Sequence, residues 1–121
     1  MSKRILTVDD SRTMRDMLRL ALEQAGFSVF QAEDGVHGLE VLEDELPDVI
    51  ITDINMPRMD GFGFIEGVRN EERLRGIPIL VLTTESDPTK KERARAAGAT
   101  GWIIKPFNPA KLVDAVRRVA A

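Results

Sequence analysis

The chain of 121 residues is long enough for one domain with a substantial core, and its 43% hydrophobic and 31% charged residues are typical of a globular protein. Its 17 Lys and Arg residues against 20 Asp and Glu residues give a net charge of -3, which argues against a dedicated nucleic-acid binder. The lack of Cys excludes disulfides, thiolate metal ligands and a Cys nucleophile. No apolar run reaches the roughly 7–15 residues of a signal peptide or the roughly 18 of a membrane span, so a cytoplasmic protein without membrane contact is expected.

Short β-branched runs alternate five times with longer segments of helical periodicity. The expected strands are Arg4–Val8, Ser28–Gln31, Val49–Thr52, Ile77–Leu82 and Gly101–Ile104. Most of these runs are continuously apolar, which is typical of strands covered on both faces of a parallel sheet. The alternation favours right-handed crossovers and a doubly wound α/β sheet, in a single domain over residues 1–121.

Apolar residues at helical spacing mark the segments between the strands. The first helix should bury a stripe that includes Met14, Met17, Leu18 and Leu22, and it should end before Gly26. The later stripes are Val36, Leu39 and Leu42, then Phe62, Ile65 and Val68, and finally Leu112, Val116 and Val119.

Polar residues mark the fourth helix and the start of the last helix. The fourth helix, at about Pro88–Ala97, has only alanines as apolar side chains, and its cations are Lys90, Lys91, Arg93 and Arg95. It is either a solvated helix or a docking surface for a partner. Before the last helix, Asn108 and Pro109 form the N-cap and N1 pair that commonly starts a helix.

The carboxyl ends of the predicted strands carry side chains that could react or bind ions. In an open α/β sheet, ligands bind beyond these ends. The second strand offers nothing comparable, but the other four end in Asp9 and Asp10, Asp53, Thr83 and Lys105.

Phosphoryl transfer to an aspartate is the chemistry that these side chains suggest. Three neighbouring carboxylates require a cation, and oxygen ligands favour Mg²⁺, whose shell is commonly completed by phosphate. A carboxylate can attack phosphorus to form an aspartyl phosphate, and Lys and Thr side chains can bind the equatorial phosphoryl oxygens.

Each of these residues also has a purely structural interpretation. Asp9 or Asp10 is alternatively the N-cap of the first helix, Thr83 the mere end of a strand, and Lys105 a turn residue. Asp60, which precedes Gly61, is expected in a turn or at a helix start. The functional interpretation therefore depends on the coincidence of all four strand ends.

Four ordered motifs resemble those of response-regulator receiver domains, in particular the stand-alone, CheY-like chemotaxis regulators. The motifs are Ile5-Leu6-Thr7-Val8-Asp9-Asp10, Thr52-Asp53-Ile54-Asn55-Met56-Pro57-Arg58-Met59-Asp60-Gly61, Leu82-Thr83-Thr84-Glu85 and Ile104-Lys105-Pro106-Phe107. The resemblance covers essentially the whole chain. It implies the flavodoxin-like strand order 2-1-3-4-5, a monomer without an output domain, and a cis peptide bond between Lys105 and Pro106.

The resemblance also implies a role for each residue of the predicted site. Asp53 would be the phosphoacceptor. Asp10 and Asp53 would bind Mg²⁺ by their side chains, Asn55 through its backbone carbonyl, and Asp9 through a water molecule. Lys105 would pair with the phosphoryl group.

In this family, a Thr at the end of the fourth strand bonds to the phosphoryl group and couples to an aromatic residue on the last strand. The corresponding residues are Thr83 and Trp102, where Tyr or Phe is more usual; Trp102 is alternatively a partly buried anchor. The switch would reshape the face formed by the fourth helix, fifth strand and fifth helix. Thr84 is bulkier than usual and is expected to slow phosphoryl transfer and hydrolysis. Glu85 and Asn55 match the chemotaxis type.

By this resemblance the chain would be a signalling phosphoacceptor rather than an enzyme. The phosphodonor would be a phosphohistidine on a sensor or chemotaxis histidine kinase, or a small donor such as acetyl phosphate. The flagellar motor switch is the expected output partner and a phosphatase a further one. A phosphate sink or phosphorelay intermediate would share every site residue.

An alternative from another class is a Mg²⁺-dependent phosphatase with an aspartyl-phosphate intermediate. Such enzymes carry Asp-x-Asp after the first strand and a cap domain. Here Asp9 and Asp10 are adjacent, and Asp53-Ile54-Asn55 lacks the second acid, which disfavours this alternative.

Overall fold

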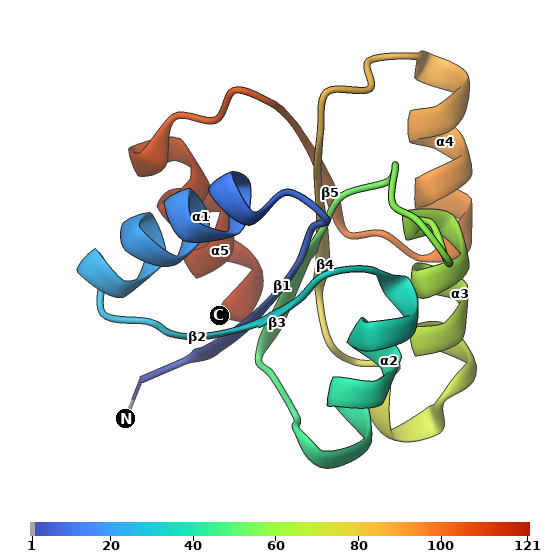
Figure 1. The fold of residues 1–121 in the computed structure, drawn as a ribbon, viewed down its shortest axis with the longest axis horizontal. Helices are drawn as coiled ribbons and strands as arrows, with labels where there is room; N and C mark the ends of the chain where they lie inside the picture. The colour runs from blue at the N-terminus through green and yellow to red at the C-terminus, as the bar shows by residue number, and fades with distance from the viewer. Residues whose placement is uncertain (1) are drawn as a thin grey trace.

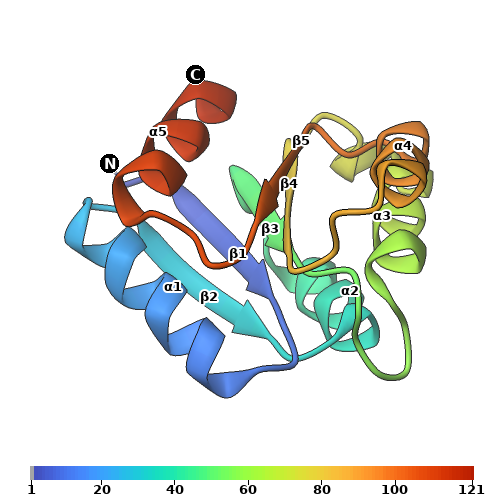
Figure 2. The ribbon, with the colours of Figure 1, turned by 90° about the horizontal axis from the view of Figure 1, so that it is seen from above.

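The computed structural model describes residues 2–121 as a parallel sheet between two layers of helices (Figures 1 and 2). The strands are β1 (Arg4–Val8), β2 (Ser28–Ala32), β3 (Val49–Thr52), β4 (Ile79–Thr83) and β5 (Gly101–Ile104). The helices are α1 (Arg12–Gln24), α2 (Gly35–Asp44), α3 (Gly61–Asn70), the 3-10 helix η1 (Glu72–Leu74), α4 (Pro88–Ala97) and α5 (Pro109–Ala120). The strand order β2-β1-β3-β4-β5 confirms the expected flavodoxin-like fold.

The sheet separates two apolar clusters because successive side chains of a strand point to opposite faces. Helices α1 and α5 cover one face, and α2, α3 and α4 cover the other (Figure 2). On β1, Ile5 belongs to the cluster beneath α1 and α5, whereas Leu6 belongs to the cluster beneath α2, α3 and α4. Within residues 2–121, no helix is both long enough and apolar enough to cross a membrane.

Side-chain caps explain where the helices begin. The caps of α1 to α5 are Ser11, Asp34, Asp60, Asp87 and Asn108, each accepting a backbone N–H of its helix. The predicted helix starts at Asp60 and Asn108 are confirmed. The interpretation of Asp9 or Asp10 as the cap of α1 is wrong, because the cap is Ser11, whose Oγ accepts the Met14 N–H at 3.2 Å. Asp9 Oδ1 instead accepts the N–H of Ser11 at 2.9 Å. Both acids are therefore available for other contacts.

Three predictions about packing and strand bounds also differ from the structure. Strand β4 begins at Ile79 rather than at Ile77, because Pro78 has no N–H for a ladder and Ile77 N–H donates to the Leu74 carbonyl at 3.1 Å. Met17 is 49% exposed instead of buried, since α1 turns Leu18 and Leu22 towards the sheet. Strand β2 is one residue longer than expected.

Helix α4 has the predicted bounds and only one buried residue, Ala94. Polar contacts hold it to its neighbours. The Arg93 guanidinium lies 4.1 Å from the centre of the Phe62 ring on α3, and Arg69 of α3 donates to the carbonyl of Gly98 just beyond α4. The helix is thus attached by a few specific contacts rather than by an apolar stripe.

Candidate functional site

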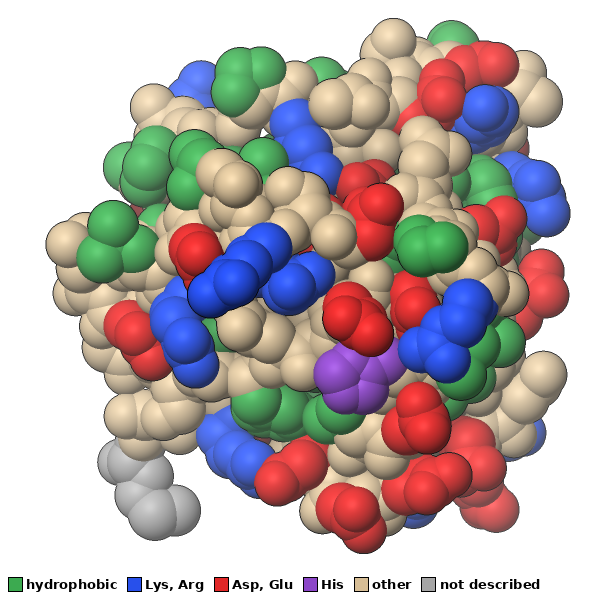
Figure 3. Space-filling view, viewed as in Figure 1, with side chains coloured by type: hydrophobic (Ala, Val, Ile, Leu, Met, Phe, Trp, Pro, Cys, Tyr) green, Lys and Arg blue, Asp and Glu red, His purple; other side chains and the backbone are tan. Residues whose placement is uncertain are grey.

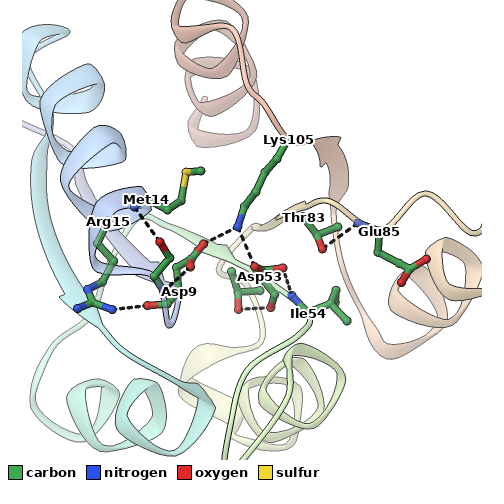
Figure 4. A network of polar contacts seen from close by, with 10 residues as sticks. Asp9, Met14, Arg15, Asp53, Ile54, Thr83, Glu85 and Lys105 are labelled. Carbon is green, nitrogen blue, oxygen red and sulfur yellow. Dashed lines mark hydrogen bonds and ion pairs between the residues drawn. The ribbon is translucent and has the colours of Figure 1, made fainter.

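Three predicted site residues meet at the carboxyl edge of the sheet (Figure 4). Asp9 follows β1, Asp53 follows β3 and Lys105 follows β5. The Lys105 ammonium lies 2.9 Å from Asp9 Oδ2 and 2.8 Å from Asp53 Oδ2. Asp10 joins them, since one carboxylate oxygen from each of the three acids lies within 4.8 Å of the others. The predicted convergence is confirmed for the ends of β1, β3 and β5.

Burial and charge act together on this cluster. Asp9 is 1% exposed, and its burial raises the pKa of its carboxyl despite the hydrogen bonds from Lys105 and from the Ser11 N–H. Burial lowers the pKa of Lys105, but its hydrogen bonds to Asp53 and Asp9 outweigh that effect and raise its pKa overall. The ammonium therefore remains charged at neutral pH.

The charge balance and donor set of the cluster fit a hard divalent cation. Three carboxylates and one ammonium give the cluster a formal excess of two negative charges, and all of the acidic donor atoms are oxygens. On this face of the molecule, Asp and Glu side chains gather near the sheet rim and over α2, with Lys and Arg side chains beside them (Figure 3). Mg²⁺ is therefore chemically compatible with the site.

The backbone holds the Asp53 side chain in one place. The Ile54 N–H donates to Asp53 Oδ1 at 2.6 Å, and the Asp53 N–H donates to the Val8 carbonyl at 2.9 Å. Behind it, Gly61 approaches so closely that an added Cβ would lie 2.3 Å from the Asp53 carbonyl oxygen. The strand end and the start of α3 together fix this carboxylate.

The predicted switch residues differ in burial and in their contacts. Thr83 is fully buried at the end of β4, and its Oγ1 accepts the N–H of Glu85 at 3.2 Å. Thr84 is exposed, and the Glu85 carboxylate pairs with Lys90 of α4 at 3.0 Å. Trp102 is half-buried on β5 and packs against the cluster beneath α2, α3 and α4.

The loop from β3 to α3 contains Asn55, which is exposed, and an ion pair that the sequence did not predict. Asp34, the cap of α2, is 3% exposed and accepts two hydrogen bonds from the Arg58 guanidinium. These bonds lower the pKa of Asp34. The Asp34-Gly35 pair is a recognisable helix-cap signal, but no local pattern links it to Arg58. The expected cis peptide bond between Lys105 and Pro106 is present.

Known proteins of similar sequence identify the family of this chain. The sequence model of the response regulator receiver domain matches residues 5–117. Chemotaxis protein CheY1 of Helicobacter pylori is 39% identical, with 92% of this chain and 91% of the relative covered. The phosphate regulon regulator PhoB of Escherichia coli is 35% identical, and the match covers 98% of this chain but 52% of PhoB. The sensor histidine kinase CheAY of H. pylori is 35% identical, and the chain spans 14% of it.

Solved structures of similar fold include receivers of two kinds. The chemotaxis response regulator CheY4 of Vibrio cholerae has a TM-score of 0.93 at 44% identity, with 98% of this chain and 99% of that chain covered. The receiver domain of the sensor histidine kinase PA1611 from Pseudomonas aeruginosa has a TM-score of 0.92 at 27% identity, with coverage of 99% and 98%. A magnesium ion is coordinated in the active-site cleft of the PA1611 structure. With its matching family model, sheet order and acidic edge, the chain belongs to the response regulator receiver domain family.

Proposed function

We propose that Asp53 accepts a phosphoryl group from a phosphohistidine of a histidine kinase, in a Mg²⁺-dependent reaction, and that the chain signals through a protein contact. The observation that carries this proposal is the Lys105 ammonium, held between the carboxylates of Asp9 and Asp53 at 2.9 and 2.8 Å. Asp10, Asp53 and the Asn55 carbonyl would hold Mg²⁺, with Asp9 acting through water. When bound, the cation neutralises negative charge on the carboxylates and on the phosphoryl oxygens.

The residues of the site have separate tasks in the proposed transfer. A carboxylate oxygen of Asp53 forms a bond to phosphorus as the phosphorus–nitrogen bond of the donor breaks, and the departing imidazole keeps that electron pair and gains a proton from solvent. The Lys105 ammonium, already at the acceptor, can pair with the incoming phosphoryl oxygens. Because Thr83 Oγ1 accepts the Glu85 N–H, its hydroxyl proton remains available for a phosphoryl oxygen. Attack of water on phosphorus would later break the bond between phosphorus and the Asp53 oxygen, release inorganic phosphate and restore the Asp53 carboxylate.

The proposed output surface is the face formed by α4, β5 and α5, with Trp102 in the switch role. A surface cavity of about 320 Å³ adjoins Trp102 and is lined on the α4 side by residues that include Pro88, Lys91 and Arg95. On β5, Ile104 is an exposed apolar side chain. Movement of Thr83 towards a phosphoryl group would change the packing next to this cavity and therefore the surface that a partner contacts.

Similarity to CheY4 and CheY1 favours a stand-alone chemotaxis regulator of residues 1–121 that binds the flagellar motor switch. The second candidate is a phosphorelay intermediate or phosphate sink, which similarity to the receiver domain of a kinase supports. A pull-down with phosphorylated and unphosphorylated protein should separate them. Motor binding that depends on phosphate supports the first; competition for kinase phosphate without motor binding supports the second. A phosphatase that shortens the phosphorylated state is a further proposed partner.

Acetyl phosphate with Mg²⁺ provides the primary test. It should add one base-labile phosphoryl group to the wild type, detected by intact mass, and none to Asp53→Asn. The matched control is Asp60→Asn, because Asp60 is another carboxylate of the same loop and Asn retains the helix cap that it provides. Normal labelling of Asp53→Asn would refute the proposal.

Two further measurements test the proposed switch. Trp102 is the only tryptophan, so its fluorescence should change when a phosphate mimic binds with Mg²⁺; an unchanged spectrum would contradict an aromatic switch. Thr84→Ala should accelerate both phosphorylation and hydrolysis, since it removes exposed bulk next to Thr83. Equal rates in the variant and the wild type would exclude a gating role for Thr84.

A further inference from the structure

The loop between β3 and α3, residues 53–60, is tied to the start of α2 by an ion pair that the proposed chemistry does not use. Arg58 Nε lies 2.7 Å from Asp34 Oδ2, and Arg58 Nη2 lies 3.0 Å from Asp34 Oδ1. The Gly35 N–H also donates to the Met59 carbonyl at 3.2 Å. Arg58 and Met59 of the loop are thus held by Asp34 and Gly35 at the start of α2.

Both partners of this ion pair are themselves fixed in place. Asp34 is 3% exposed, and its Oδ1 also accepts the His37 N–H at 2.9 Å, so the carboxylate is immobilised by the first turn of α2. Arg58 has φ of 64°, the only positive φ of a non-glycine residue within residues 2–121. This left-handed backbone is unfavourable for Arg and requires support from the surroundings. The bidentate contact supplies that support.

The same loop carries two of the proposed magnesium donors. Asp53 begins it, and Asn55 lies three residues before Arg58. The Gly61 N–H donates to the Ile54 carbonyl at 2.8 Å, so this hydrogen bond joins the two ends of the loop. The contacts of Arg58 and Met59 with the start of α2 hold the tip of the loop. Without the contact at the tip, the backbone around Asn55 would be restrained from one side only.

We propose that Asp34 and Arg58 are positioning residues for the divalent cation, because their ion pair fixes the loop that presents the Asn55 carbonyl beside Asp53. The inference rests on the proposed magnesium site and deepens it. Neither residue touches the cation; both act through the backbone of the loop. Contacts of this kind behind metal ligands commonly change metal affinity by about 10–100-fold.

A simple electrostatic effect would leave a different signature. Removing the negative charge of Asp34 would weaken binding of a cation, whereas removing the positive charge of Arg58 would strengthen it. Loss of positioning weakens binding in both cases. The sign of the Arg58 effect therefore separates the two explanations.

The experiment is a calorimetric titration of the metal-free protein with MgCl₂ in wild type, Asp34→Asn and Arg58→Asn. Asn retains a helix cap at position 34 and tolerates the left-handed backbone at position 58, so both variants should fold. Each should bind Mg²⁺ about 10-fold more weakly than the wild type. The double variant should be no weaker than the worse single one, because both changes break the same contact. The control is Glu45→Gln, which breaks the ion pair with Arg4 beyond the other end of α2 and should leave affinity unchanged.

Amide hydrogen exchange of the metal-free proteins gives the second readout. The amides of residues 55–59 should exchange faster in both variants than in the wild type, and those of the control should not. Unchanged exchange, or an Arg58→Asn affinity equal to or above that of the wild type, would overturn the inference. A wild type that does not bind Mg²⁺ at all would instead refute the proposed function on which the inference rests.

Discussion

Gly61→Ala should damage both the fold and the proposed phosphoacceptor site. An added Cβ would lie 2.3 Å from the Asp53 carbonyl oxygen and 2.7 Å from the Ile54 Cα. Both are backbone atoms that no side-chain rotation can remove, so the strand end or the start of α3 must shift. The upper range of overpacking costs, about 3 kcal/mol, therefore applies.

The expected net effect follows from the opposing terms. Replacing glycine by alanine in a helix gains about 1 kcal/mol at most, so Gly61→Ala should lower the free energy of unfolding by about 2 kcal/mol. With a urea dependence of about 2 kcal/mol per molar, the unfolding midpoint should fall by about 1 M. Phosphorylation of Asp53 by acetyl phosphate should fall in parallel, because the displaced backbone belongs to the acceptor.

Gly63→Ala is the matched control, two residues further along α3. There the nearest atom to an added Cβ is Met59 Cγ, at 3.1 Å, on a flexible side chain that can move. This variant should be neutral or up to about 1 kcal/mol more stable than the wild type, since it removes a glycine from a helix interior. A Gly61→Ala midpoint at or above that of the wild type, with normal phosphorylation, would refute the steric reasoning.

Three further predictions concern charged side chains. Asp9→Asn should raise the urea midpoint of the Mg²⁺-free protein at pH 7. Folding raises the pKa of Asp9, so the contribution of this group to stability is complete below its usual pKa of 3.8 and is lost as the pH rises through its pKa in the folded protein. Saturating Mg²⁺ should reverse this order by stabilising the wild type more, and a lower midpoint for the variant without Mg²⁺ would contradict the argument. Folding raises the pKa of Lys105, so the contribution of its ammonium to stability is complete below the usual pKa of 10.5 and is lost as the pH rises through the pKa in the folded protein. Lys105→Met should therefore remove part of the loss of stability that the wild type shows at alkaline pH. An identical pH profile of the variant and the wild type would count against this reasoning. Arg69→Gln should lower the free energy of unfolding by about 2–4 kcal/mol, because Arg69 donates to four backbone carbonyls. The control is Arg95→Gln, which removes an exposed ion pair with Glu92 at 3.8 Å and should change the free energy of unfolding by less than about 0.5 kcal/mol. Similar effects of the two Arg changes would disprove the role of the carbonyl contacts.

The sequence predicted those parts of the molecule that depend on short-range patterns. Continuous apolar runs located the strands, and the strand ends then located Asp53 and Lys105, because parallel strands deliver their carboxyl ends to one edge. The caps at Asp60 and Asn108 were likewise readable from local residue types. In these cases the determining contacts lie within a few residues or follow from the topology.

Features that depend on tertiary contacts were missed. The partnership of Asp34 with Arg58 joins residues 24 positions apart, and its existence depends on a left-handed backbone at Arg58 that the residue type disfavours. The exposure of Met17 was missed because helical periodicity fixes the spacing of an apolar stripe but not how far around the helix the sheet reaches. The start of β4 depended on Pro78 and on η1, whose short turn has no periodic pattern.

The division of the apolar core into two clusters affects how a domain of this kind can diverge. Ile5 and Leu6 are neighbours in sequence, yet the sheet places them in different clusters. Changes of volume beneath α1 and α5 must therefore be compensated there, and their energetic effects should add to those of changes beneath α2, α3 and α4. The acidic edge lies at the ends of the strands, but it also depends on the helix layer of α2 and α3, because the start of α3 approaches Asp53 and the cap of α2 contacts the loop after β3. The face beneath α1 and α5 can therefore change, residue by residue, to suit a new partner with less effect on Asp53 and on the opposite face.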